Sequence, residues 1–262
     1  MKLLVKLGGT LLDSAASADA LARQIVAARA SGAEIVVVHG GGKQMTRFLG
    51  ERGVESRFVN GLRVTGPEVV DAVLKVFAGT VNHELVARLN RAGALAVGIT
   101  GIDALLVEAE QMNPELGAVG RVVKSNSGLL HALLGGGFLP VVACVAGDRD
   151  GNVYNVNADQ MAVACAVAFG VDQLVFLTDV EGVLDGSKQV RRQLTAEESR
   201  QLIVDGAATG GMQAKLEAAM AALAGGVEAV RIAPGASAGV LERLLAGDVI
   251  GSRLVRGGVQ TA

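Results

Sequence analysis

Short apolar runs alternate along the chain with longer stretches that have helical periodicity. Residues 2–7, 34–38 and 174–177 are rich in Val, Leu and Ile, whereas apolar residues recur at helical spacing through 67–91. Such alternation predicts a parallel sheet with right-handed crossover connections. Half of the residues are hydrophobic but only 3% are aromatic, which suits aliphatic strands buried on both faces. We therefore expect an α/β fold in which helices sandwich the sheet.

The individual elements can be placed by their periodicity and by their turn residues. We expect strands at 2–7, 34–38, 94–99, 139–145, 174–177, 230–232 and 252–255, short strands or hairpins within 105–123, and a hairpin turn at 147–151. Helices are expected from Ser17 or Asp19 to Gly32 and at 43–52, 67–91, 126–134, 159–169, 195–205, 211–223 and 238–245. No linker or repeat divides the 262 residues, although early and late halves can face one cleft at the carboxyl ends of the strands.

Charge and cysteine usage narrow the classes of partner. The chain has 24 basic and 26 acidic residues, which predicts no binding to nucleic acid or anionic membranes and leaves a small molecule as the expected partner. The uncharged run 125–147 is interrupted by three glycines and Pro140, so we expect helix, turn and strand there rather than a membrane span. Cys144 and Cys165 stand singly in apolar surroundings, which predicts buried reduced thiols and a cytoplasmic location.

Two clusters of glycine follow the carboxyl ends of predicted strands. They are Gly8-Gly9 and Gly40-Gly41-Gly42. The chain has neither a P-loop motif nor the dinucleotide fingerprint GxGxxG, so another use of glycine is needed. Bare backbone N–H groups at these positions can approach an anion closely. The alternative is that both clusters form only tight strand-to-helix turns.

Two lysines stand at positions that ordinarily disfavour a positive charge. Lys6 lies inside an apolar strand, where an uncompensated ammonium group would lose its hydration. Lys215 falls within the apolar stripe of a predicted helix and close to the start of that helix, where the dipole disfavours cations. A bound polyanion would explain both positions. The alternatives are a Lys6 side chain that reaches solvent and a Lys215 side chain on the solvated flank of its helix.

Three further polar residues are candidates for a site. Asn157 and Asp159 open a predicted helix, where they can cap it and complement its dipole, or Asp159 can hold two cationic side chains in position. Arg63 lies in a loop between apolar residues and suits a bidentate grip on a carboxylate. The three histidines are scattered and form no metal-binding pattern, and a catalytic base at His39 is the minor alternative.

Taken together, these motifs resemble the amino acid kinase family over nearly the whole chain. The carriers are KLGG at 6–9, HGGG at 39–42, NGLRVT at 60–65, NVNADQ at 155–160, LTDVEGVL at 177–184 and GGMQAK at 210–215. The resemblance is strongest to members that phosphorylate the side-chain carboxylate of N-acetyl-L-glutamate with ATP in arginine biosynthesis. It implies a three-layer α/β/α sandwich with a mainly parallel central sheet. It also implies one domain, 1–262, with a substrate and dimerisation lobe at about 1–155 and an ATP lobe at about 156–262.

The resemblance implies roles for individual residues. Lys6 and Lys215 would stabilise the transferring phosphoryl group, and Asp159 would orient the two lysines. Gly41, Gly42, Arg63 and Asn155 would bind the acyl amino acid. The ATP site would comprise Gly8, Gly9, Thr178, Asp179, Val180, Glu181, Gly182, Val183, Leu184, Ala207, Ala208, Thr209 and Gly211. The acceptor is already ionised at pH 7, so no general base is required, and Mg²⁺ would bind through the phosphates of ATP rather than in a protein metal site.

The chain departs from the family pattern in two places, and the sequence leaves two rival functions open. Many members carry a lysine where this chain has Ile102, so contacts there are not carried over. An N-terminal helix that links dimers in arginine-inhibited members is missing before Lys2, which predicts an arginine-insensitive homodimer with the helix at 67–91 as its face. A kinase for a carrier-bound aminoadipate or glutamate would need a basic rim such as Arg57, Arg121 and Lys124. A non-catalytic amino-acid sensor of this fold is the other rival.

Overall fold

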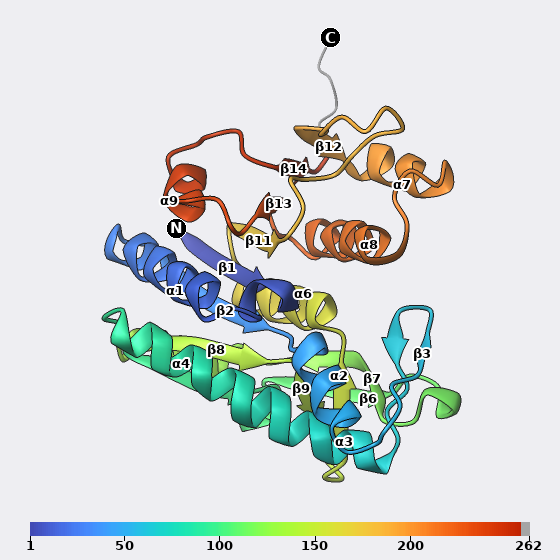
Figure 1. The fold of residues 1–262 in the computed structure, drawn as a ribbon. Coiled ribbons are helices and arrows are strands. Elements are labelled where there is room, and N and C mark those ends of the chain that lie inside the picture. Colours follow the sequence, from blue (N-terminus) through green and yellow to red (C-terminus); the bar gives the residue numbers. More distant parts are fainter. Residues whose placement is uncertain (258–262) are drawn as a thin grey trace.

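One large, mainly parallel sheet organises the molecule. The computed structural model describes residues 1–257, and its eight-stranded sheet has the order β12-β14-β13-β11-β1-β2-β8-β5 (Figure 1). The strands are β1 (Lys2–Leu7), β2 (Glu34–His39), β5 (Ala96–Thr100), β8 (Leu139–Ala143), β11 (Gln173–Thr178), β12 (Gln193–Thr195), β13 (Ala229–Pro234) and β14 (Ser252–Val255). Neighbouring strands run parallel except β13 and β14. The predicted α/β fold class is confirmed.

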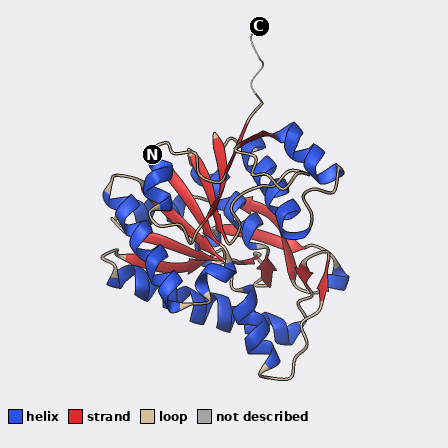
Figure 2. Cartoon of the chain, turned by 45° about the horizontal axis from the view of Figure 1, so that its top comes forward, coloured by secondary structure: helices blue, strands red, loops and turns tan. Residues whose placement is uncertain are grey.

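Helices cover both faces of this sheet, as Figure 2 shows. On one face lie α1 (Ala15–Ala30), α4 (Asn82–Arg91) and α9 (Val240–Leu245), and on the other α6 (Ala158–Phe169) and α8 (Gly210–Ala224). Side chains of β1 alternate between the two cores, with Leu3 and Val5 in the first and Leu4 in the second. The strand is therefore apolar on both faces, and Lys6 is its one charged side chain after Lys2.

A smaller group of strands lies beside the carboxyl edge of the large sheet. It is a closed four-stranded barrel of β6 (Val107–Gln111), β7 (Val119–Ser125), β9 (Val145–Gly147) and β10 (Val153–Val156). The strands β9 and β10 pair antiparallel around the turn that the sequence predicts at 147–151. A separate two-stranded antiparallel hairpin consists of β3 (Phe58–Val59) and β4 (Leu62–Arg63).

The predicted helix at 67–91 is interrupted by a π-helical segment. It consists of α3 (Pro67–Val73), the eight-residue π-helical segment η2 (Leu74–Val81) and α4. Hydrogen bonds from i to i+5 shift the side chains relative to an α-helix. Apolar periodicity alone does not distinguish the two geometries, because both present an apolar face to the core.

Several boundaries differ from the sequence-based expectations. Helix α1 begins after Ser14, whose hydroxyl accepts from the backbone N–H of Ser17, rather than at Ser17 or Asp19. The expected strand 139–145 is divided into β8 and β9. Thr195, predicted to open a helix, ends the unpredicted strand β12 and also caps the next helix through a capping box. The remaining helices are α2 (Gly42–Gly50), α5 (Gly128–Gly135) and α7 (Ala196–Val204), and the 3-10 turns are η1 (Gly9–Leu12), η3 (Asp103–Leu105) and η4 (Pro114–Leu116).

No helix within the described part of the chain has the length and apolar character needed to cross a membrane. The run 125–147 instead forms the predicted helix, turn and strand, as α5, the turn at 136–138 and β8 with β9. Residues 258–262, the end of the predicted domain and of its ATP lobe, lie outside the described residues.

Candidate active site

Three strands deliver the glycine clusters and a polar loop to the same edge of the sheet. Gly8 follows β1, Gly40 follows β2, and Thr178 ends β11. Strand β1 pairs in parallel with β2 on one side and with β11 on the other, so their carboxyl ends lie together. The chain leaves β1 toward β2 and returns to its other side much later as β11, which makes this edge a topological switch point, where α/β proteins bind ligands.

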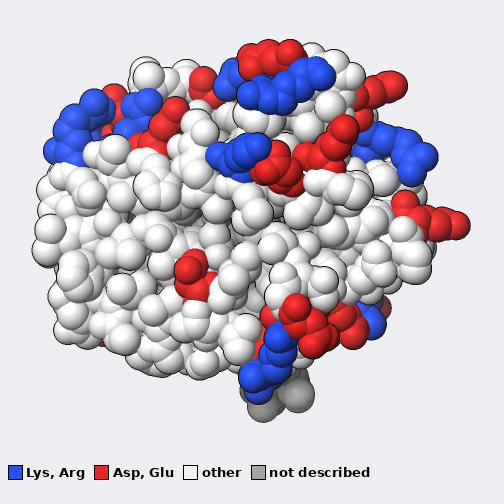
Figure 3. Space-filling view, turned by 90° about the horizontal axis from the view of Figure 1, so that it is seen from below, with Lys and Arg blue, Asp and Glu red and all other residues white. Residues whose placement is uncertain are grey.

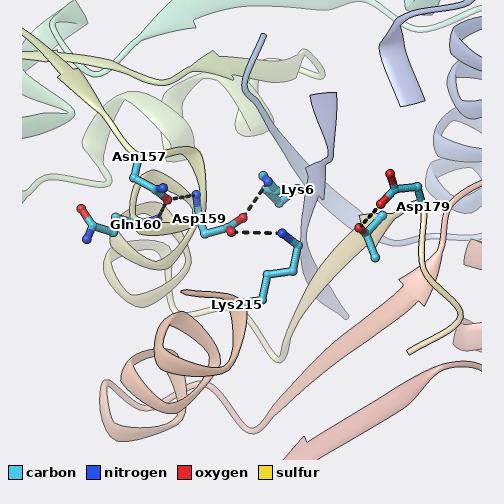
Figure 4. Close-up of polar contacts among 7 residues, drawn as sticks. Lys6, Asn157, Asp159, Gln160, Asp179 and Lys215 are labelled. Atoms are coloured by element: carbon cyan, nitrogen blue, oxygen red, sulfur yellow. Dashed lines mark hydrogen bonds and ion pairs between the residues drawn. The ribbon is translucent and has the colours of Figure 1, made fainter. Parts of the chain in front are cut away.

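A buried carboxylate joins two lysines at this edge. In Figure 4 the side chains of Lys6, from β1, and Lys215, from α8, both point to Asp159, in the first turn of α6. The Lys6 Nζ lies 2.6 Å from Oδ1 of Asp159, and the Lys215 Nζ lies 3.4 Å from Oδ2. The side chains of Lys6 and Asp159 are 8% and 7% exposed, and that of Lys215 is 17% exposed. Neither lysine therefore extends freely into solvent.

Lys6, Asp159 and Lys215 form a triad that carries one positive charge in excess. Burial works against ionisation of Asp159, but the ammonium groups of Lys6 and then Lys215 outweigh it, so the pKa of Asp159 lies below its usual value. One carboxylate thus faces two ammonium groups in a site largely shielded from water. An anion placed against the lysines would complete the charge balance, which agrees with the polyanion inferred from the sequence.

Helix α6 is capped independently of this role. The side chain of Asn157 accepts hydrogen bonds from the backbone N–H groups of Asp159, at 2.8 Å, and Gln160, at 3.3 Å (Figure 4). The two sequence-based alternatives for this segment therefore both hold, with Asn157 as the cap and Asp159 as the partner of two lysines. The cap also fixes the start of the helix, and with it the Asp159 side chain.

The two glycine clusters face one another. A Cβ atom built on Gly9 would lie 3.6 Å from the amide nitrogen of Gly42. Within residues 1–257, the N–H groups of Gly9, Gly41 and Gly42 donate to no acceptor. The N–H group of Gly8 instead donates to the carbonyl of Leu177 at 2.9 Å, so it is not available to an anion. The expectation of free N–H groups at each of these glycines thus needs correction at Gly8.

Arg63 is held firmly by neighbouring groups. Its Nη2 donates to the carbonyl of Gly42 at 3.0 Å and to the hydroxyl of Thr46 at 2.8 Å, and its Nη1 donates to the Ser56 hydroxyl. The guanidinium also lies over the Phe58 ring, 4.6 Å from its centroid. These contacts leave Nε–H and one N–H of Nη1 for a ligand, so the free bidentate fork expected from the sequence is partly occupied.

The remaining predicted residues divide into groups at the rim and groups in the core. Asn155 donates to the hydroxyl of Thr65 at 3.1 Å. Of the predicted ATP residues, Thr178 ends β11, Asp179, Val180, Glu181, Gly182, Val183 and Leu184 follow it, and Ala207, Ala208 and Thr209 precede α8. Val180 and Leu184 are 39% and 42% exposed, whereas Val183 and Ala208 belong to the buried core. The side chains of Val183 and Ala208 are therefore buried, and at these two positions only backbone atoms are available to a ligand.

The charge of Lys215 also acts on Asp179. Burial would raise its pKa, but hydrogen bonds from its own backbone and from the Thr178 hydroxyl, together with the charge of Lys215, lower it below the usual value. The hydrogen bond from Thr178 Oγ1 to Asp179 Oδ1 is 3.1 Å long and is drawn in Figure 4. The loop after β11 is thus electrostatically linked to Lys215.

A cavity of about 1060 Å³ opens beside the triad. Asp159, Lys215 and Gly211 line it, and the other predicted site residues do not. Its wall also contains Asn157, Gln160, Gln213, Arg121 and the hairpin residues Asn60, Gly61 and Leu62. Gln160 and Gln213 fall within the motifs NVNADQ and GGMQAK, but neither was predicted to bind a ligand. Arg121 was named only for the basic rim of the carrier-bound alternative. The tertiary fold brings Arg121, on β7, and Gln213, on α8, to the wall of one cavity.

Other candidate chemistry is excluded for the described residues. His39 is fully buried and its pKa is lowered to about 4 by burial, so it is not placed as a base in the cavity. Cys144 and Cys165 are free and buried, and burial raises the pKa of each thiol to about 12. Residues 1–257 contain no group of three or more His, Cys, Asp and Glu side chains that could hold a metal ion.

Comparisons with known proteins show which family the sequence matches. Residues 1–234 match the model of the amino acid kinase family. The chain is 72% identical over 255 residues to the acetylglutamate kinase of Solibacter usitatus (strain Ellin6076), covering 97% of this chain and 99% of that protein. It is 43% identical to the acetylglutamate kinase of Acidobacterium capsulatum, covering 95% of this chain and 96% of that protein.

Solved structures share the fold. An N-acetylglutamate synthase from Neisseria gonorrhoeae, complexed with coenzyme A and N-acetyl-glutamate, aligns with a TM-score of 0.87 at 25% identity. The alignment covers 98% of this chain but 60% of the synthase, so the chain spans less than two thirds of that protein. The carbamate kinase of Giardia lamblia bound to AMP-PNP aligns with a TM-score of 0.71 at 16% identity and 98% coverage of both chains, which shows the fold alone.

Proposed function

The chain belongs to the amino acid kinase family, and we propose that it transfers the γ-phosphoryl group of ATP to the side-chain carboxylate of N-acetyl-L-glutamate. The product is N-acetyl-L-glutamyl 5-phosphate, and the reaction is a step of arginine biosynthesis. The structural observation that carries the proposal is the Asp159 carboxylate between Lys6 and Lys215, at the edge where both glycine clusters meet. The 72% identity to an acetylglutamate kinase supports the acceptor.

The residues at this edge suit phosphoryl transfer. Such reactions depend on positioning and on electrostatic stabilisation of the transferring group more than on covalent help from the protein. We assign that stabilisation to the ammonium groups of Lys6 and Lys215, which Asp159 holds on one carboxylate. The acceptor carboxylate is ionised at pH 7 and needs no base.

We assign the binding positions of the two substrates from the glycine clusters and the residues that neighbour them. We assign Gly9 and Gly42, whose N–H groups are free, to the anionic groups between the lobes, and Gly41, Arg63 and Asn155 to the acyl amino acid. The ATP side comprises the chain after β11, the residues before α8, Gly211, and Gly8 as a close-approach position. These assignments make 1–155 the substrate lobe and the residues from 156 onward the ATP lobe of one domain.

ATP brings its own metal ion in this proposal. The described residues contain no group of three or more His, Cys, Asp and Glu side chains that could hold a metal ion, and Mg²⁺ commonly keeps phosphate and water ligands. The excess positive charge of the triad fits the polyphosphate of a nucleotide. We therefore assign Mg²⁺ to the ATP phosphates, where it would neutralise their charge.

We also propose a homodimer located in the cytoplasm. Seen from below, the molecule presents a broad, mostly uncharged area that contains one acidic group, and most charged side chains gather at its rim (Figure 3). In Figure 1 this is the side on which α4 lies. A second copy of the chain would cover such a face, which includes the helix at 67–91. The two free, buried thiols suit the reducing cytoplasm.

The carrier-bound alternative would need a basic rim, and acidic neighbours offset part of it. Arg121 pairs with Glu110, whereas Lys124 lies 3.9 Å from a carboxylate oxygen of Glu108, whose carboxylate it shares with Arg149, at 2.9 Å. The non-catalytic sensor would not need both lysines on Asp159.

The direct test is an assay with MgATP and N-acetyl-L-glutamate in which hydroxylamine traps the acyl phosphate. Glutamate, N-acetyl-2-aminoadipate and a reaction without acceptor are the comparisons. We expect hydroxamate with acetylglutamate alone, and its loss in Lys6→Ala. The matched control is Lys43→Ala, because the Lys43 side chain is 62% exposed and pairs only with Asp13.

Two results would contradict the proposal. Hydroxamate formed equally well by Lys6→Ala at an unchanged melting temperature would remove the triad from the reaction. Absence of product with every free acceptor, despite measurable ATP binding, would favour a carrier-bound substrate or a sensor.

A further inference from the structure

A buried histidine and asparagine lie directly behind the second glycine cluster. His39 ends β2 and is 0% exposed, and Asn82 begins α4 and is 1% exposed. The His39 Nδ1 lies 2.8 Å from the carbonyl oxygen of Gly40, and its Nε2 lies 3.0 Å from the Asn82 Nδ2. The Asn82 Nδ2 also lies 3.0 Å from the carbonyl oxygen of Val141. Neither side chain lines the cavity.

These partners specify one tautomer of the imidazole ring. The Gly40 carbonyl can only accept, so Nδ1 must carry a proton. The Val141 carbonyl likewise orients the Asn82 amide with its NH₂ group inward, and this group can only donate, so Nε2 must be unprotonated. Burial keeps the ring neutral at pH 7, because it lowers the pKa of His39 to about 4.

Side chains of the π-helical segment η2 also pack against this glycine cluster, at Gly41. A Cβ atom on Gly41 would lie 2.9 Å from Cδ1 of Phe77 and 3.3 Å from Cγ2 of Val81. In an α-helix, residues five apart such as Phe77 and Asn82 diverge by about 140°. Hydrogen bonds from i to i+5 bring them onto one face. The π geometry thus allows one segment to place Phe77 against Gly41 and Asn82 against His39.

We propose that His39 and Asn82 are positioning residues that fix the peptide planes of the second glycine cluster for the reaction. The Nδ1–H group holds the Gly40 carbonyl, and the N–H group of Gly41 belongs to the same planar peptide unit, so this free N–H group is held in one orientation at the start of the cluster. Asn82 enforces the tautomer that makes this hydrogen bond possible. The inference rests on the proposed function for its kinetic test, but its spectroscopic test is independent of activity.

Two variants of His39 separate positioning from packing. Asn and Leu have the same number and branching of side-chain heavy atoms, but only Asn can offer an N–H group at the position of Nδ1. We expect kcat/KM for acetylglutamate to fall on the order of 10²-fold in His39→Leu and to be largely rescued in His39→Asn. His83→Asn, an exposed change next to Asn82, is the control. A purely structural role would lower the melting temperature and leave kcat/KM well below that temperature unchanged.

The tautomer itself can be read by long-range ¹H–¹⁵N correlation NMR on the wild-type protein at pH 7, with the His39 signals assigned by their loss in His39→Asn. We expect a neutral ring protonated at Nδ1 and its partial conversion to the other tautomer in Asn82→Leu. Protonation at Nε2 in the wild type would overturn the proposal, as would equal kcat/KM in His39→Leu and His39→Asn. Failure of the wild type to phosphorylate acetylglutamate would instead contradict the proposed function.

Discussion

At the scale of single residues, two carboxylates with lowered pKa values illustrate different causes. Asp159 is buried, and the charges of Lys6 and Lys215 hold it ionised against the effect of burial. Asp148 lies in the turn between β9 and β10, and its pKa is lowered to about 2, chiefly because the Asn152 side chain donates to it. The backbone N–H groups of Asn152 and Asp150 and the Tyr154 hydroxyl also donate. The first carboxylate serves the site and the second only organises a turn.

The Asp148 turn makes a testable prediction about pH. Its pKa lies below the ordinary value of 3.8, so the stabilisation it supplies is present above about pH 4 and is lost as the pH falls toward 2. We expect Asp148→Ala to lower the melting temperature at pH 7, and the difference from wild type to shrink over that acidic range. Asp150→Ala, in the same exposed turn, is the control. A deficit that stays constant from pH 7 to pH 2 would refute the hydrogen-bonded carboxylate as its cause.

At the scale of elements, the start of α2 packs closely against the π-helical segment η2. Gly41 precedes α2 with a φ of −179°, an extended conformation that any residue can adopt. Its requirement for glycine therefore comes from the Phe77 ring and not from backbone strain. Substitution there tests the packing between two elements.

We expect Gly41→Ala to lower kcat/KM at least tenfold, because Phe77 or the glycine cluster must shift to admit the methyl group. Adding Phe77→Leu should recover part of the loss by removing ring atoms from the contact. Gly50→Ala is the matched control, since no atom lies within 4 Å of its built Cβ. Steady-state kinetics of the four proteins provide the measurement, and a fully active Gly41→Ala variant would contradict the predicted contact.

At the scale of the whole molecule, the proposed dimer would cover the mostly uncharged face that Figure 3 shows. Leu74 begins the π-helical segment and is 39% exposed, and Val204 on α7 is 78% exposed. We expect the wild type to scatter light with about twice the 26.6 kDa mass of the chain, and Leu74→Glu to shift it toward the monomer. Val204→Glu, on an element outside the proposed face, should leave the mass unchanged. A monomeric wild type at micromolar concentration would rule out the dimer.

Much of the fold and part of the site were predictable from the sequence because their signals are local. Apolar periodicity and turn residues located most elements, and β14 was predicted with its observed bounds. Lys6 and Lys215 were noticed because each contradicts an elementary rule, one for apolar strands and one for helix dipoles. Gln213 and Arg121 contradict no local rule, and although Gln213 stands in a family motif and Arg121 was a candidate for a basic rim, no local signal predicted that they line one cavity.

The sequence by itself therefore determined the alternation of strands and helices and the residues whose placement demanded an anion. Only the tertiary structure decided that Lys6 and Lys215 share the carboxylate of Asp159, because β11 pairs with β1 and α8 packs on α6 through contacts distant in the sequence. It also decided that the Gly8 N–H group is engaged, that Arg63 is already held, and that Asn82 reaches His39. Local patterns report what each residue requires, whereas long-range packing selects which partner meets that requirement.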